Sequence, residues 1–122
     1  MQVPLEITFR GFPHSDAVEA RIREKAAKLE QFCDGIISCR VAVELDHQHQ
    51  HQGKLFHVRI DLSVPGKHIV VSRERHDKQE HEDMYVALRD AFDVAKRQLE
   101  EYMRIQRGEV KRHLAPALSE AP

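Results

Sequence analysis

Three histidines that alternate with glutamines carry the residue type that binds transition metals. His47, His49 and His51 fall on one face if this stretch is extended. Gly53 then indicates a reversal of the chain, and tetrahedral structural zinc needs four ligands, whereas neither Cys nor carboxylate is fixed beside the three imidazoles. We therefore expect a polar hairpin tip, no metal and no cofactor. The three histidines remain the candidate ligands if a metal is bound.

Catalytic motifs give no support to an enzyme. The sequence has no GxSxG elbow, Walker loop, HExxH or GxGxxG. His76 and His81 are of a residue type that titrates near neutrality, but no recognisable nucleophile accompanies them. The sequence therefore predicts a protein that is not an enzyme.

Basic residues gather on one flank of each of two predicted helices. At 100° per residue, the three on the first helix fall within about 60° of one another. Three on the second fall within about 20°, with two more further round. The set comprises Arg21, Lys25 and Lys28, then Arg89, Lys96 and Arg107, with Arg97 and Arg104. Two such flanks, side by side, suit the phosphates of folded RNA.

Two features of the sequence favour other interpretations of these helices. Acidic residues are interspersed on the second helix, so its polar face is also typical of a solvated surface with i,i+4 ion pairs. Aromatic residues are few and fall mostly in the predicted core, which disfavours stacking on single-stranded bases.

The periodicity of apolar residues places these flanks in a small fold. The predicted elements are a strand over 3–10, a helix from Ser15 or Asp16 to Phe32, strands over 36–46, 54–64 and 67–73, and a helix over 81–107 with Asp83 as N-cap. This order predicts an α+β fold, β-α-β-β-β-α. Its four-stranded mixed or antiparallel sheet has two helices packed on one face and a polar opposite face. Pro65-Gly66 indicates the turn between the last two strands.

The composition and length limit the classes of protein to which the chain could belong. The chain has 122 residues, of which 41% are apolar and 32% charged, and a net charge of -1, so any nucleic-acid binding must come from local sorting of charge. We expect one domain over 1–107, a flexible tail over 108–122, no membrane span and no signal peptide. Cys33 and Cys39 match no CxxC pattern, which favours reduced thiols in a cytoplasmic protein.

Four short motifs, at their places in this order of elements, resemble one known family. They are Lys25-Ala26-Ala27-Lys28-Leu29-Glu30, Val64-Pro65-Gly66, His81-Glu82-Asp83-Met84-Tyr85 and Arg97-Gln98-Leu99. Over about residues 5–107 the chain resembles the ribosome hibernation promoting factors, also called ribosome-associated inhibitor A or the sigma-54 modulation protein family, in their short form.

The resemblance implies a fold similar to a double-stranded RNA-binding domain. It also implies a factor that binds 16S rRNA in the mRNA–tRNA channel of the 30S subunit and blocks translation in stationary phase or stress. The partners would be the 30S subunit in 70S or paired ribosomes, and the free protein would be a monomer. The family's rRNA-binding residues carry over to Lys25, Lys28 and Arg97.

Departures from the family pattern concern the second helix and the chain length. Val94 and Glu101 stand where relatives commonly have basic residues, with Lys96 and Arg104 as possible substitutes. We also expect a short form, without the second, dimerising domain of the long form. Two other functions stay open: a protein-binding regulator, for example of a sigma factor, that uses the exposed sheet face, and a metal-binding protein built on the histidine hairpin.

Overall fold

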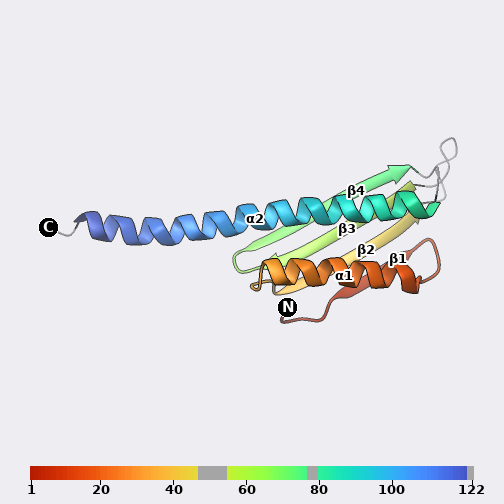
Figure 1. Cartoon of the computed structure of the whole chain (residues 1–122), viewed down its shortest axis with the longest axis horizontal. Helices are drawn as coiled ribbons and strands as arrows, with labels where there is room; N and C mark the ends of the chain where they lie inside the picture. Colours follow the sequence, from red (N-terminus) through yellow and green to blue (C-terminus); the bar gives the residue numbers. More distant parts are fainter. Residues whose placement is uncertain (47–54, 77–79, 121–122) are drawn as a thin grey trace.

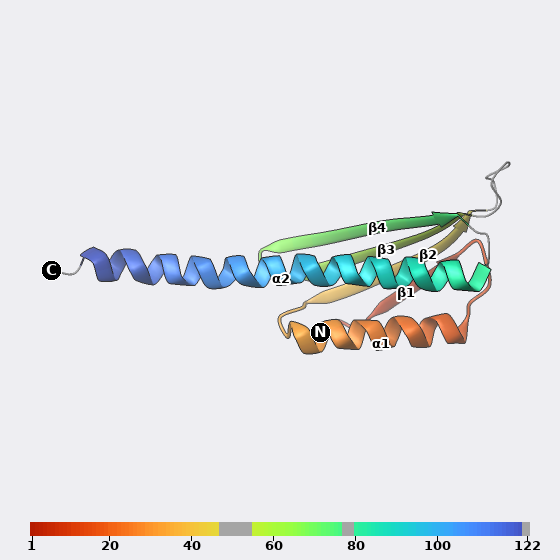
Figure 2. The same ribbon diagram turned by 45° about the horizontal axis from the view of Figure 1, so that its top comes forward.

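The structure is a computed structural model that describes residues 1–46, 55–76 and 80–120. Its elements are β1 (Glu6–Arg10), α1 (Asp16–Phe32), β2 (Ser38–Asp46), β3 (Leu55–Val64), β4 (Lys67–His76) and α2 (Glu80–Glu120). β1 pairs in parallel with β2, and the other neighbours pair antiparallel, so the sheet is mixed with the order β1-β2-β3-β4. Both helices lie on one side of it (Figures 1 and 2). The predicted α+β order and the two-layer arrangement are confirmed.

Alternation along each strand separates an apolar from a polar face of the sheet. The register aligns Ile7, Val41, Ile60 and Val71 across all four strands, and the last three of these are at most 2% exposed. The neighbouring row, Arg40 beside Asp61, lies on the opposite face because successive side chains of a strand point to opposite sides. The sequence predicted this pattern correctly for β2, β3 and the first half of β4.

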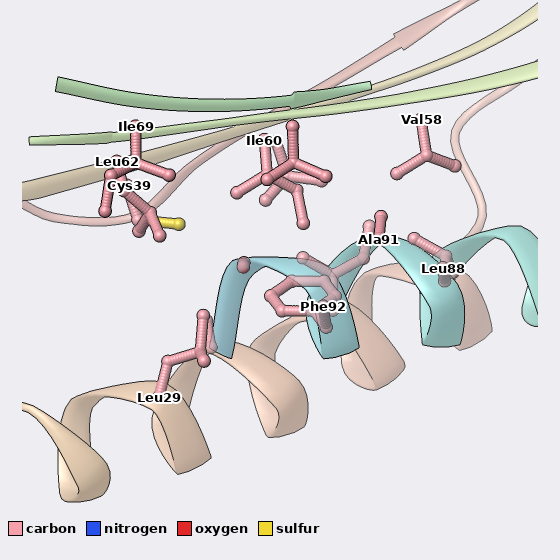
Figure 3. Close-up of a cluster of buried hydrophobic side chains, with 14 of the residues drawn as sticks. Leu29, Cys39, Val58, Ile60, Leu62, Ile69, Leu88, Ala91 and Phe92 are labelled. Carbon is pink, nitrogen blue, oxygen red and sulfur yellow. The ribbon is translucent and has the colours of Figure 1, made fainter. Parts of the chain in front are cut away.

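The core lies between the apolar face of the sheet and the two helices. α1 contributes a buried stripe of Val18, Ile22, Ala26 and Leu29, and the C-cap residue Cys33 is buried beside it. α2 contributes Leu88, Ala91, Phe92, Ala95 and Leu99 among others. Figure 3 shows Leu88, Ala91 and Phe92 from α2 and Leu29 from α1 close to strand residues that include Ile60 and Leu62. Burying each large aliphatic side chain stabilises the fold by about 1.5–3 kcal/mol, which fixes the position of both helices on the sheet.

Two local features hold the helices in place. Ser15 is the N-cap of α1, and its hydroxyl accepts a hydrogen bond of 3.3 Å from the Val18 amide. The predicted turn at Pro65-Gly66 joins β3 to β4, and Gly66 adopts φ +79°. The Tyr102 hydroxyl on α2 donates a 2.7 Å hydrogen bond to the Pro65 carbonyl. This bond ties α2 to the end of the hairpin, close to the last buried turn of the helix.

The strand bounds differ from the prediction at both edges of the sheet. β1 begins at Glu6 and not at residue 3, because its pairing with β2 starts at Glu6 opposite Arg40. Val3 is 44% exposed, although its amide donates to the Ile37 carbonyl. β4 continues past Arg73 to His76, because β3 extends far enough to pair with it as far as Leu55.

The predicted bounds of the second helix were wrong at both ends. α2 already includes Glu80, so Asp83 is inside the helix and does not cap it. α2 also continues beyond Arg107 through Gly108 to Glu120, and its last turns project past the sheet (Figure 1). The prediction that helical structure ends at Arg107 is therefore wrong. The division of the chain into a domain over 1–107 and a flexible tail over 108–122 stays a prediction.

Candidate nucleic-acid interface

α1 and α2 run side by side in the same direction on the sheet (Figures 1 and 2). Two cation–π contacts join them. The Arg21 guanidinium carbon lies 5.0 Å from the centroid of the Tyr85 ring, and the Lys96 ammonium lies 5.4 Å from the centroid of the Phe32 ring. Each contact is worth about 0.5–1 kcal/mol at an exposed site. The first pair joins early turns of both helices and the second joins later ones, so cations lie along the line where the helices meet.

A groove of about 270 Å³ opens between the two helices at the second of these contacts. α1 lines it with Lys25, Lys28, Leu29 and Phe32, and α2 lines it with Phe92, Asp93 and Lys96. Leu29 and Phe92 belong to the buried core, so they form an apolar floor. The three lysines form a cationic rim around that floor. Of the eight predicted residues, the structure thus brings Arg21, Lys25, Lys28 and Lys96 together along one seam.

The other predicted residues follow α2 at different positions. Arg89 lies between Tyr85 and Phe92 at a helical spacing that puts it on the same stripe as Lys96. Arg107 continues that stripe, but it lies about 16 Å beyond Lys96 along the helix axis, past the last turn of α1. Arg97 and Arg104 are both exposed and lie about 80–100° further round α2 than Lys96. They therefore extend the basic surface over α2 and away from the groove.

Ion pairs engage three of the eight cations. Lys28 lies 3.5 Å from Glu24, Arg89 lies 3.3 Å from Asp90, and Arg104 lies 2.5 Å from Glu101. All three pairs are on the surface, where such pairs contribute between zero and about 1 kcal/mol. Within the described parts of the chain, Arg21, Lys25, Lys96, Arg97 and Arg107 make no ion pair. A phosphate would therefore compete with few intramolecular carboxylates.

The interpretation from sequence missed the aromatic and acidic members of the groove. Phe32 is outside the buried stripe of α1, and it falls within about 40° of Arg21, Lys25 and Lys28 around the helix axis. This position beside the basic residues was the feature of the sequence that could have identified Phe32 as part of the site. Asp93 also lines the groove, and it forms no hydrogen bond or ion pair with the residues that the structure describes. The groove is thus cationic at its rim, apolar at its floor, and carries one unpaired carboxylate.

The candidate metal ligands do not enter this groove. His47, His49 and His51 lie outside the described residues. A different set, His14, Asp16 and Glu19, gathers at the start of α1. The two ring nitrogens of His14 face different carboxylates, at 3.3 Å from Asp16 and 3.6 Å from Glu19. Glu19 also lies 3.5 Å from Arg23. This arrangement is a network of surface ion pairs when His14 is protonated.

None of the helices in the described residues combines the length and the apolar character that a membrane crossing would need.

Comparison with known proteins relates most of the chain to one group. The family model described as "Sigma 54 modulation protein / S30EA ribosomal protein" matches residues 5–107. A curated protein of Deinococcus radiodurans, named "Ribosome hibernation promotion factor", is 28% identical over 97 residues. The match covers 80% of this chain and 47% of that protein. The chain therefore spans about half the length of the curated relative that it matches.

Solved structures show the same fold. A ribosomal subunit interface protein from Coxiella burnetii matches with a TM-score of 0.66 and 18% identity, over 82% of this chain and 97% of the other. The N-terminal domain of Protein Y from Thermus thermophilus matches with a TM-score of 0.64 and 21% identity, over 84% and 99%. At these identities the likeness establishes the fold alone.

Proposed function

The chain belongs to the sigma 54 modulation protein / S30EA ribosomal protein family, and we propose that it is a ribosome-associated translation inhibitor, active in the cytoplasm and not an enzyme. The name of the curated relative supports a role in ribosome hibernation. The names of the two structural neighbours concern a subunit interface and Protein Y, and their fold is the fold described above. The stages of growth at which the factor acts would be stationary phase or stress.

The proposed target is 16S rRNA in the mRNA–tRNA channel of the 30S subunit. One observation carries this proposal: cations from two parallel helices line a single seam, although the whole chain has a net charge of -1. Parallel rows of ammonium and guanidinium groups suit two runs of phosphates in folded RNA, which proteins recognise largely by shape. A factor bound there would exclude mRNA and tRNA by occupying their path.

Binding of this kind has a measurable electrostatic signature. Each phosphate contact releases counterions, so the logarithm of the affinity falls with the logarithm of the salt concentration by about 0.7–0.9 per contact. We expect Lys25→Ala, Lys28→Ala and Arg97→Ala together to reduce that slope by about 2–3. The triple variant should no longer sediment with 70S ribosomes at moderate salt, while its circular dichroism spectrum stays unchanged because all three side chains lie at the surface.

A matched control removes the same charge from the opposite face of the sheet. Arg10, Arg40 and Arg59 are exposed there, and Arg40 and Arg59 pair only with Glu6 and Asp61 among the described residues. Their replacement by Ala should leave sedimentation with ribosomes intact. If the helix variant sediments normally and the sheet variant does not, the proposed interface is wrong.

The outer sheet face supports a second candidate function, a protein-binding regulator. It carries a pocket of about 280 Å³ lined by Ser38, Arg40, Arg59, Asp61, Ser63 and His68. The Oδ1 atom of Asp61 is buried there with no hydrogen-bond partner among the described residues, and the Nε2 atom of His68 lies 3.6 Å from it, beyond hydrogen-bond distance. A donor group of a ligand could bond to this oxygen in competition with His68. Ribosome-free complexes that depend on Arg40 and Arg59 would favour this function over the first.

A further inference from the structure

The interhelical groove has a composition that phosphate binding alone does not explain. A surface that only tracks the RNA backbone needs cations, and it gains nothing from an apolar floor or a carboxylate. Here the floor is Leu29 and Phe92, a second ring, Phe32, lines one wall, and Asp93 lies among three lysines. We propose that this groove receives one unstacked guanine of the bound RNA, a proposal that rests on the proposed function.

The Phe32 ring offers a surface on which a base can stack. Bases that leave the stack are commonly bound on aromatic side chains, because every base has a π-face. Phe32 is only partly buried, and in the free protein the Lys96 ammonium covers its face at 5.4 Å. Stacking of a base on an aromatic ring is stronger than an exposed cation–π contact. A base can therefore replace the ammonium on Phe32, which releases Lys96 toward a neighbouring phosphate.

The Asp93 carboxylate determines which base the groove prefers. Asp93 is unpaired among the described residues, and an anion beside RNA phosphates weakens binding unless the ligand donates hydrogen bonds to it. Guanine is the base whose Watson–Crick edge presents two adjacent donors, N1–H and the N2 amino group. Both can bond to one carboxylate, as the fork of an arginine does. Uracil offers a single N–H donor between two carbonyl acceptors, which Asp93 would repel.

The lysines provide the remaining contacts. Lys25, Lys28 and Lys96 surround the floor on both helices, so the phosphates on either side of an extruded nucleotide meet a cation on each wall. The groove of about 270 Å³ is just below the range of ordinary small-ligand pockets, which leaves room for one base. The geometry thus assigns a single-nucleotide subsite within a surface that otherwise recognises shape.

Kethoxal probing of 70S ribosomes tests the proposal with the full chain, because this reagent reacts with the N1 and N2 atoms of unpaired guanine. We expect the chain to protect at least one 16S guanine. Phe32→Leu keeps an apolar side chain but removes the ring, and Asp93→Asn keeps the size but removes one acceptor. Both variants should still sediment with ribosomes and should restore the kethoxal reaction at that guanine. Val70→Ala, at an exposed apolar residue of the outer sheet face, is the control and should protect it fully.

Binding to matched RNA hairpins gives the size of the effect. The probes differ in one bulged nucleotide, which is guanosine, inosine or uridine, and inosine lacks only the N2 amino group. We expect fluorescence anisotropy to give about 10-fold tighter binding of the guanosine bulge than of either alternative, because only guanosine offers both hydrogen-bond donors to the Asp93 carboxylate. Asp93→Asn should abolish the difference between guanosine and inosine. Phe32→Leu should weaken the binding of all three hairpins, because every base stacks on the ring, and Phe32→Tyr should retain the affinity.

Failure of this inference is distinct from failure of the proposed function. If the chain sediments with ribosomes but both groove variants protect the same guanines as the original chain, the guanine subsite is wrong and the interface stands. Equal affinity for all three hairpins would also overturn the subsite. If the original chain does not sediment with ribosomes at all, the proposed function itself is wrong.

Discussion

Cys39 shows how its position in β2 controls the chemistry of a single side chain. It is fully buried on the apolar face of the sheet, and like Cys33 it is a free thiol, as the sequence predicted. Burial, with a smaller contribution from the charge of Asp61, raises the pKa of the Cys39 thiol from 9.0 to about 12. The folded protein therefore holds this thiol in its neutral form at physiological pH.

This pKa predicts a loss of stability in alkali. Above about pH 9 the unfolded chain loses the Cys39 proton while the folded chain retains it, so the unfolded state binds fewer protons and stability falls. The contribution of Cys39 is complete below pH 9 and is lost as the pH rises toward about 12, at a limiting slope of about 1.4 kcal/mol per pH unit. Urea unfolding at several pH values measures this slope.

The comparison variant is Cys39→Ala, because tyrosines and lysines also titrate in this range. Its stability should be lower at pH 7, since the substitution leaves a small cavity, but it should fall less steeply with pH. Parallel curves for the two proteins between pH 9 and 12 would contradict the altered pKa.

At the level of single residues, the sequence predicted the site in part. Helical spacing was sufficient to place Arg21, Lys25 and Lys28 on one flank, because it depends only on local geometry. It did not indicate that Phe32 and Asp93 share a groove with Lys96, because the contact joins two helices far apart in the sequence. Helical spacing puts Lys96 and Arg107 on the same stripe of α2, so it could not show that Lys96 lines the groove and that Arg107 lies beyond it. The tertiary arrangement decides both points.

Among the elements, the junction between β1 and α1 has the strictest steric requirement. Gly11 adopts φ +82°, and a Cβ atom there would lie 2.0 Å from the Leu45 carbonyl oxygen on β2. Gly11→Ala therefore combines left-handed strain with a collision against backbone. We expect it to lower the free energy of unfolding by about 2–4 kcal/mol, measured by urea denaturation.

Alanine substitutions at two other glycines separate the cost of left-handed strain from the cost of the collision. Gly66 has φ +79° with open space around it, so Gly66→Ala should cost only the strain, about 1 kcal/mol. Gly35 has neither a positive φ nor a neighbour within 4 Å, so Gly35→Ala should be neutral or slightly stabilising. A Gly11→Ala protein as stable as the Gly35→Ala protein would show that β2 does not approach this junction closely.

Strands were more predictable than the ends of the second helix. Alternation identified β2 and β3 because one face of each is buried, and a shift by one residue would expose it. The end of α2 has no such constraint where the helix leaves the sheet. The predicted helix stops just before Gly108, but α2 continues through this residue. A glycine costs a helix only about 1 kcal/mol, and the many good helix formers around it offset that cost.

The whole molecule consists of a compact two-layer body and a helix that projects from it (Figure 2). Among the described residues, the buried part of α2 ends near Tyr102, whose hydroxyl bonds to the Pro65 carbonyl. The turns beyond Arg107 lie past the sheet and past α1 (Figure 1). Stability should therefore depend on α2 as far as Tyr102 and hardly at all on the projecting turns.

Truncation at two points tests this division. A chain that ends after Arg107 should melt within about 4 °C of the full chain, which corresponds to less than about 1 kcal/mol for a domain of this size. A chain that ends after Gln98 loses Leu99, which is fully buried, and the bond from Tyr102 to Pro65. Loss of a buried Leu alone costs about 2–5 kcal/mol, a large part of the stability of an ordinary domain. We expect this shorter chain to be unfolded at 37 °C.

The chain that ends after Arg107 also tests the predicted domain boundary at residue 107. If residues 1–107 contain the whole ribosome-binding surface, the chain that ends after Arg107 should sediment with 70S ribosomes as the full chain does, with the same dependence on salt. All the groove residues lie before this point, so the kethoxal protection should also persist. A chain that keeps its melting temperature but no longer sediments would place essential contacts on the projecting turns of α2, and the rRNA interface would then extend beyond the groove between the helices.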